Sequence, residues 1–242
     1  MTPAISIRGL DFRYCGGERD VLADLHLDVA TGSRLLLVGA NGAGKSTLLS
    51  VLGGRHLIPE ERVRVLGRPA FHDTALAGEV ALLGGAFPFD VDLGVGEILA
   101  RQHASDPARR DALVALLGVD PGWRMHRVSD GQRRRVQLLL GLLRPARLML
   151  LDEITTDLDV VARLDLLDFL RRETESREAT ILYATHILDG LESWATHLAW
   201  IDRGRLRLAA PLAEVAELTA LRKAGATAPL LQLVDQWLRA AR

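Results

Sequence analysis

Cysteine is nearly absent from this sequence, because Cys15 is the only one among 242 residues. A disulfide within the chain is therefore excluded, and the composition favours a reducing compartment, most simply the cytoplasm. Uninterrupted apolar runs of about 20 residues, the length that a membrane-spanning helix needs, are missing as well. The first residues lack a basic segment followed by an apolar stretch, so we expect no signal peptide. A role at a membrane would be peripheral, and another chain would cross the bilayer.

A strong net charge is also missing. The sequence has 30 Lys and Arg residues against 31 Asp and Glu residues, which gives a net charge of -1. We therefore expect no general attraction to nucleic acid or to an anionic membrane. Charged residues make up 25% and hydrophobic residues 48% of the chain, as in ordinary globular proteins. The length allows one large domain or two small ones, with a sizeable core.

Short apolar runs alternate with helical patterns along the chain. The expected strands are residues 5–12, 25–29, 34–38, 80–83, 148–151, 180–184 and 198–201, and the expected helices include residues 45–52, 133–143 and 158–172. Leucines at helical spacing predict a mostly helical segment over residues 86–145. The alternation predicts an α/β fold with a mostly parallel sheet and helices on both faces. Residues 212–242 are predicted to be helices that either pack on the sheet or form a partner surface.

A glycine-rich loop, GANGAGKST, follows the strand expected at residues 34–38 and fits the pattern GxxxxGK[ST]. Glycines let such a backbone wrap around phosphate oxygens, and the helix that begins near Lys45 adds the positive end of its dipole. Lys45 would reach the β- and γ-phosphates, and the Ser46 hydroxyl would bind Mg²⁺. The expected nucleotide-binding residues of the loop are Gly39, Asn41, Gly42, Ala43, Gly44, Lys45, Ser46 and Thr47.

Two acidic residues, Asp152 and Glu153, follow the apolar run at residues 148–151. An aspartate at the carboxyl end of a parallel strand lies where ligands bind in such sheets, so Asp152 is the second expected Mg²⁺ ligand. Glu153 is expected to face another way and to polarise an attacking water. The glycine-rich loop and the acid pair occur together in many P-loop enzymes, including small-molecule kinases and GTPases.

A third motif, Val-Ser-Asp-Gly-Gln at residues 128–132, separates these possibilities. Here the sequence resembles the ATP-binding cassette (ABC) ATPases, whose signature reads roughly Leu-Ser-Gly-Gly-Gln in this place. The arginines that follow, residues 133–135, are predicted to be a solvated helix face. The resemblance covers nearly the whole chain, and it implies ATP and Mg²⁺ as ligands and ATP hydrolysis as the reaction.

The resemblance also implies further functional residues. Tyr14 matches an aromatic residue that stacks on adenine, residues 156–159 match a loop at a dimer interface, and His186 matches the family's switch histidine. His186 would hold the γ-phosphate and the attacking water, beside Glu153 as the second catalytic residue.

A shared site follows from the same resemblance, because the family pairs two cassettes head to tail. Each nucleotide would lie between the phosphate loop of one chain and the signature of the other. Ser129 and the backbone of Gly131 would then contact the γ-phosphate bound to the second chain, at a helix N-terminus, and Gln132 belongs to the same signature.

The fold implied by the resemblance is a P-loop NTPase (RecA-like) core with an antiparallel β subdomain and an inserted helical subdomain. The whole chain, 1–242, would be a single nucleotide-binding domain. Residues 1–85 and 146–211 would form the β subdomain and the core, residues 86–145 the helical subdomain, and residues 212–242 the C-terminal helices.

Three positions depart from the family pattern. Asp130 stands where glycine is usual, and its carboxylate would repel a γ-phosphate unless it turns away or is neutralised. Gly84 and Gly85 stand where the family has a glutamine that touches Mg²⁺ and relays motion to a permease, and Gln102 lies too far downstream to replace it. Ile154 replaces the usual proline after the acid pair, which predicts only a change in packing.

A finer resemblance follows from residues 129–137, 151–159 and 184–191. They look like the small soluble ABC ATPases without a permease, first known as accessory factors of the fungal Not transcription-regulatory complex. A soluble cytoplasmic ATPase with a regulatory or assembly role is therefore one function to consider.

Two other functions remain open at this stage. The chain could be the motor subunit of a membrane transporter, with a permease as its partner, or an ATP-gated interaction module with little hydrolysis, as Asp130 suggests. In each case the expected partner is a second cassette, most simply a second copy of this chain, together with an unidentified protein. Direct binding of nucleic acid and membrane insertion of the chain itself are not expected.

Overall fold

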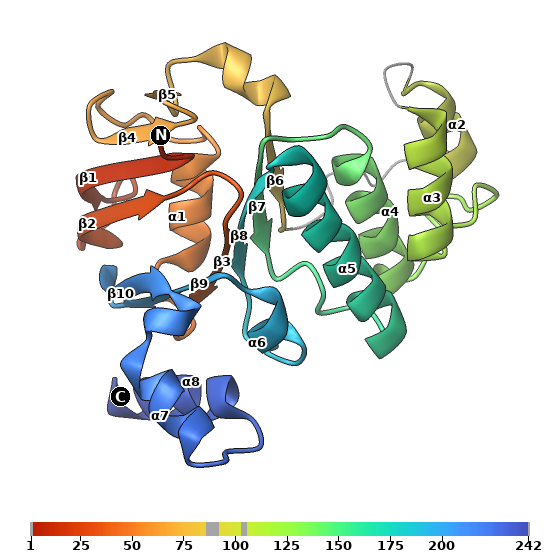
Figure 1. Cartoon of the computed structure of the whole chain (residues 1–242). Coiled ribbons are helices and arrows are strands. Elements are labelled where there is room, and N and C mark those ends of the chain that lie inside the picture. The colour runs from red at the N-terminus through yellow and green to blue at the C-terminus, as the bar shows by residue number, and fades with distance from the viewer. Residues whose placement is uncertain (1, 86–91, 103–105, 242) are drawn as a thin grey trace.

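The computed structural model describes residues 2–85, 92–102 and 106–241 (Figure 1). Within these residues the larger sheet has the strand order β10-β9-β3-β8-β7-β6. Its strands are β3 (Arg34–Val38), β6 (Val80–Leu83), β7 (Leu148–Asp152), β8 (Thr180–Ala184), β9 (His197–Asp202) and β10 (Arg205–Pro211). Neighbouring strands are parallel except for β9 and β10. The carboxyl ends of the parallel strands therefore meet at one edge of the sheet.

A smaller antiparallel sheet has the order β2-β1-β4-β5. It is built from β1 (Ile5–Phe12), β2 (Leu22–Val29), β4 (Val63–Val65) and β5 (Arg68–Pro69). Figure 1 shows helix α1 (Lys45–Leu52) between this sheet and the larger one. One buried cluster joins α1 to both sheets through side chains that include Leu35 and Leu37 of β3.

Two long helices, α4 (Asp130–Leu142) and α5 (Val160–Arg177), cover the other face of the large sheet (Figure 1). Helix α3 (Pro107–Leu117) packs on α4 and α5 further from the sheet, and the shorter α2 (Val95–Ala100) lies beside α3 (Figure 1). Helix α6 (Leu191–Trp194) and the 3-10 turn η1 (Thr74–Gly78) flank the sheet. Leu36 and Val38, which alternate with Leu35 and Leu37 along β3, belong to the cluster on this second face. The strands are thus buried on both faces, as their continuous apolar runs predict.

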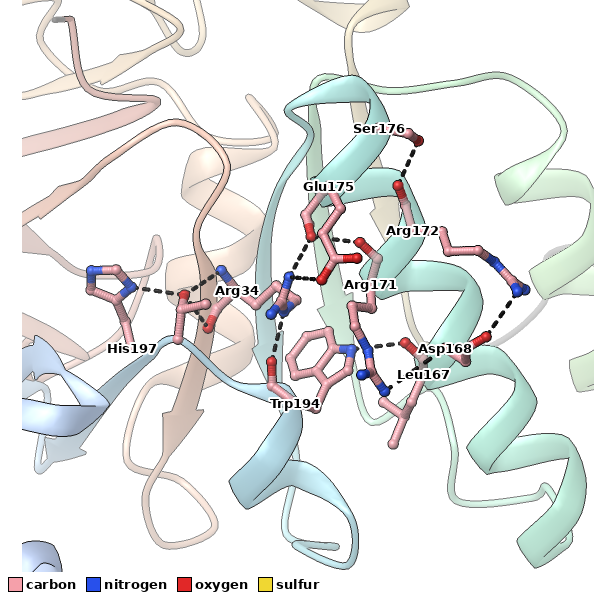
Figure 2. A network of polar contacts seen from close by, with 11 residues as sticks. Arg34, Leu167, Asp168, Arg171, Arg172, Glu175, Ser176, Trp194 and His197 are labelled. Carbon is pink, nitrogen blue, oxygen red and sulfur yellow. Dashed lines mark hydrogen bonds and ion pairs between the residues drawn. The ribbon is translucent and has the colours of Figure 1, made fainter.

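The start of β3 is tied to α5 and α6 by the guanidinium group of Arg34 (Figure 2). It donates to the carbonyl oxygen of Trp194 (2.6 Å) and to the hydroxyl of Thr174 (2.6 Å), and it lies 3.5 Å from the Glu175 carboxylate. The Trp194 indole donates in turn to the carbonyl oxygen of Leu167. This network fixes the end of β3 that lies away from the glycine-rich loop.

A second polar contact joins α3 to α5 and is buried. Arg109 and Glu173 form a bidentate ion pair with two hydrogen bonds (2.7 and 3.0 Å). Their side chains are only 6% and 7% exposed. Arg109 also donates to the carbonyl oxygen of Leu142 at the end of α4, and its guanidinium lies over the Phe169 ring. One arginine therefore holds three helices together.

The C-terminal segment packs back on the large sheet. It consists of η2 (Leu212–Glu214), α7 (Ala216–Lys223) and α8 (Pro229–Ala240). Trp237 of α8 stacks on Trp200 of β9, with ring centroids 4.8 Å apart and planes within 6°. Leu230, Leu233 and Val234 are buried in the same cluster. Of the two alternatives for these helices, packing on the sheet is the one the structure has.

The expected α/β arrangement with a mostly parallel sheet is confirmed. Strand β10 was not predicted, and the expected elements differ mainly at their ends. The second strand begins at Leu22 rather than at residue 25. The helix expected at residues 158–172 begins at Val160, because the Asp159 carboxylate caps it by accepting the amide of Ala162 (2.9 Å). The division of the chain into core, helical and C-terminal parts stays a prediction.

The buried ion pair predicts a large difference between two neighbouring arginines. Arg109→Met removes both short hydrogen bonds from the buried Glu173 carboxylate and leaves it only the longer contact with Arg177 (3.6 Å), so the loss of unfolding free energy is expected to approach that of a broken buried pair, about 3–5 kcal/mol. Arg110→Met removes only a more exposed pair with Asp111, worth about 0–1 kcal/mol. Urea denaturation of both variants and the wild type measures the two losses. Equal losses would contradict the role given to the Arg109 pair.

Candidate active site

The glycine-rich loop joins the end of β3 directly to the start of α1. Gly39 leaves no room for a side chain, because a Cβ there would lie 2.3 Å from the carbonyl oxygen of Ile201. The Lys45 ammonium donates to the carbonyl oxygens of Gly39 (2.7 Å) and Ala40 (3.1 Å). The loop is thus held in one shape by the sheet behind it and by its own lysine.

A cleft of about 240 Å³ opens beside this loop. It is lined by Val21, Asn41, Gly42, Gly44, Lys45, Ser46, Thr47, Asp152 and Glu153. Burial lowers the pKa of Lys45, and the carboxylates of Glu153 and Asp152 act in the opposite direction. The structure therefore brings most of the predicted nucleotide-binding residues and both acids to one place, where a cation faces two anions.

The cleft has the oxygen donors that suit Mg²⁺, since Ser46 and Asp152 both line it. In the described parts of the chain, no group of three or more His, Cys, Asp or Glu side chains is arranged to hold a metal ion. Mg²⁺ is usually bound through only one or two protein groups, with phosphate oxygens and waters as its other ligands. A hydroxyl and a carboxylate beside a phosphate loop fit that requirement.

The Glu153 carboxylate is held by the residues that follow β8. Thr185 donates its hydroxyl to Glu153 Oε2 (2.9 Å), and the His186 amide lies 3.3 Å from the same oxygen. His186 Nδ1 lies 2.9 Å from Glu153 Oε1. The two predicted catalytic residues are therefore in contact. Sequence reasoning missed Thr185, although its place between β8 and His186 in Ala-Thr-His was a signal.

Tyr14 lies over the start of α1. Its hydroxyl is 3.1 Å from the hydroxyl of Thr47, and its ring contacts Phe12 and His56 edge to face, with centroids 5.0 and 5.4 Å away. The residue is 44% exposed, so part of the ring is open to a base. Phe12 and His56, which contact this ring, were not predicted; Phe12 lies two residues before Tyr14, but His56 comes from a distant segment.

The signature residues cap helix α4. The Ser129 hydroxyl accepts the amide of Gln132 (3.2 Å), and the Gln132 side-chain oxygen accepts the amide of Ser129 (2.9 Å). Asp130 is exposed in the first turn, where a carboxylate stabilises the positive end of the helix dipole. Gly131 is half-buried beside it. The signature residues, Ser129 to Gln132, are not among those that line the cleft of the same chain.

The sequence matches the ABC transporter family over residues 22–156. The chain belongs to this family. ABC cassettes are ATPases that bind ATP with Mg²⁺, so the predicted activity and ligands are confirmed. None of the helices in the described residues combines the length and the apolar character needed to span a bilayer.

Two relatives and one solved structure place the cassette more closely. It is 48% identical over 98% of its length to ABC transporter I family member 21 of Arabidopsis thaliana, of which it covers 86%. It is 40% identical over 84% of its length to CCR4-associated factor 16 of Saccharomyces cerevisiae, of which it covers 77%. A dimeric ATP-binding cassette bound to ADP and Pi shares the fold, with a TM-score of 0.73 at 17% identity, over 86% of this chain and 98% of that chain. The predicted P-loop NTPase fold and the finer resemblance are confirmed.

The arginines that follow the signature of the cassette do not form a solvated face, and that prediction is wrong. Residues 133–135 are half-buried, and each donates to a main-chain carbonyl of another segment. Arg134 reaches the carbonyl oxygens of Gly85 (3.1 Å) and Glu153 (2.9 Å). Successive residues point in different directions around a helix. Because α4 is packed on several sides, the three arginines contact different segments.

Only one of the two glycines that stand in place of the usual glutamine is crowded. Gly84 has a φ of +151°, and a Cβ there would lie 2.6 Å from the Cβ of Asp152. A side chain at position 84 would therefore collide with Asp152, whereas a Cβ at Gly85 would meet no atom within 4 Å. Residues 86–89, which follow the glycine pair, lie outside the described residues. Ile154 is fully buried, in agreement with the packing role expected for it.

Tyr14→Ala is expected to weaken ATP binding by about 1–3 kcal/mol, because loss of an aromatic platform under a base costs that much. Tripolyphosphate has no base, so its affinity is expected to stay unchanged. Isothermal titration calorimetry with both ligands measures the difference. Tyr14→Phe, which keeps the ring and loses only the contact with Thr47, is the matched control. A similar loss for both ligands in Tyr14→Ala would contradict a role in binding the base.

Proposed function

We propose that this cassette hydrolyses ATP at the interface of two copies arranged head to tail, and that it serves a cytoplasmic regulatory or assembly role without a permease. The observation that carries the proposal is the contact between Glu153 and His186 (2.9 Å) beside the phosphate loop. A carboxylate that contacts a histidine and lines a phosphate-binding cleft is suited to activating a water molecule.

Within one chain, each group of the cleft has a role in this proposal. The backbone of residues 39–47 binds the phosphates, and Lys45 neutralises part of their charge. Ser46 and Asp152 hold Mg²⁺, which supplies further positive charge to the phosphate oxygens. Glu153 accepts the proton of the attacking water, and His186 orients both the water and the γ-phosphate.

The second copy is needed because the signature residues do not line the cleft of their own chain. The Ser129 hydroxyl oxygen accepts the Gln132 amide, so its proton remains available for a phosphate of the other chain. The N-terminus of α4 adds positive dipole charge at the same point. The dimeric state of the ADP-bound cassette of similar fold supports this arrangement.

The absence of a permease rests on the glycine pair and on the relatives. Gly84 and Gly85 offer no side chain that could relay motion to a membrane subunit, and Asp152 leaves no room for one at position 84. The yeast relative is named for its association with CCR4, which supports a protein partner for this chain as well.

Glu153→Gln tests the hydrolytic part. It keeps the shape of the side chain but removes the base, so phosphate release is expected to fall by about 10²–10⁴-fold while ATP affinity is retained. Phosphate release and calorimetric ATP titration measure the two quantities. A wild-type rate no higher than that of the variant would contradict an enzymatic role and favour an ATP-gated interaction module.

The same variant tests the absence of a permease. Glu153→Gln with ATP, used as bait in detergent extracts of the native cell, is expected to retain no membrane-spanning protein. The wild type without ATP serves as the control. A stable detergent-extracted complex with a permease would contradict the proposal and make the chain a transporter motor.

A further inference from the structure

Helix α4 contacts the catalytic acid directly, through one arginine. The guanidinium of Arg134 donates to the carbonyl oxygen of Glu153 (2.9 Å) through Nη2. Through Nη1 it donates to the carbonyl oxygen of Gly85 (3.1 Å) and to the side chain of Gln137 (2.7 Å). Gln137, one turn further along α4, donates weakly to the carbonyl oxygens of Gly84 and Gly85 (3.4 and 3.5 Å). These two side chains thus hold the backbone of two loops at once.

The backbone that Arg134 holds at Glu153 is an unusual one. Glu153 has a φ of +49°, in the left-handed region that residues other than glycine rarely adopt. Its carbonyl accepts hydrogen bonds from Arg134 and from the Thr156 hydroxyl (3.0 Å), and its amide donates to the carbonyl of Ala184 (2.9 Å). Such a conformation persists only where neighbouring groups fix it. The direction of the Glu153 carboxylate depends on this conformation.

We propose that Arg134 is a positioning residue for ATP hydrolysis, which fixes the backbone of Glu153 and connects it to the signature helix. The proposal rests on the proposed role of Glu153 as the base. Asp152 excludes a side chain at position 84, so Arg134 and Gln137 supply from α4 the polar contacts to this segment.

The placement on α4 has a further consequence in a head-to-tail dimer. Ser129 caps α4 and faces the nucleotide bound to the other chain, while Arg134 on the same helix holds the acid that serves the nucleotide of its own chain. One rigid element therefore connects the two ATP sites. A change at one γ-phosphate that shifts α4 alters the position of Glu153 at the other site.

Steady-state kinetics of Arg134→Met tests the proposal. The change keeps the aliphatic stem and removes the donors, so kcat is expected to fall by about tenfold to a hundredfold, as for a catalytic group displaced by about 1 Å. The KM for ATP and the thermal midpoint are expected to stay close to those of the wild type. Cooperativity between the two sites, measured as the Hill coefficient for ATP, is expected to fall towards one.

Three matched variants separate the explanations. Arg133→Met changes the preceding arginine, whose side chain makes one long contact within the described residues, to the carbonyl oxygen of Met125 (3.5 Å). This variant is expected to keep the wild-type kcat. Arg134→Lys keeps one charged donor and is expected to recover part of the rate, which a loss of folding would not allow. Glu153→Gln reports on the base itself. If its rate equals that of the wild type, the proposed function is wrong, and not only the role given to Arg134.

Two results would overturn the positioning role while Glu153→Gln remains inactive. The first is a wild-type kcat in Arg134→Met. The second is a parallel loss of kcat, ATP affinity and thermal stability in both Arg134→Met and Arg134→Lys, because a structural role would produce that pattern.

Discussion

Parallel pairing of β3, β8 and β7 is the constraint on which the site depends. Because these strands end at one edge of the sheet, the phosphate loop, the acid pair and the Thr185–His186 turn must meet there. Side chains distant in sequence then meet directly, as the proposed catalytic residues His186 and Glu153 do. The buried clusters on both faces of the sheet keep those strand ends in register.

Two glycines at this edge of the sheet lie so close to neighbouring residues that they limit which side chains the site can contain. Gly39 lies against Ile201, and Gly84 lies against Asp152, so neither position accepts a side chain. The glycine pair that includes Gly84 lacks the usual glutamine, and Arg134 and Gln137 of helix α4 donate to the carbonyl oxygens of this pair. The glycine pair, Arg134 and the left-handed backbone of Glu153 are thus connected by hydrogen bonds into one arrangement.

Much of this could be predicted from the sequence, because its signals are local. Apolar runs located β3, β7 and β8, and motif spacing located Lys45, Asp152 and Glu153. What could not be predicted were contacts between segments distant in sequence. The support of Tyr14 by His56, the buried Arg109–Glu173 pair and the hold of Arg134 on Glu153 all depend on tertiary packing. From the sequence alone, the arginines at 133–135 were predicted to face solvent, because the carbonyl groups that surround them come from other segments.

The central claim is that each ATP is enclosed by two chains, one of which presents Ser129. Sedimentation velocity of Glu153→Gln with Mg²⁺ and ATP tests it most directly, because the variant retains the nucleotide. The account predicts a species of twice the mass of the chain with ATP, the single chain with ADP, and the single chain with ATP when Ser129→Arg is added to block the interface. A single chain at saturating ATP would contradict it. So would a dimer that forms equally with ATP and ADP and persists when Ser129→Arg is added.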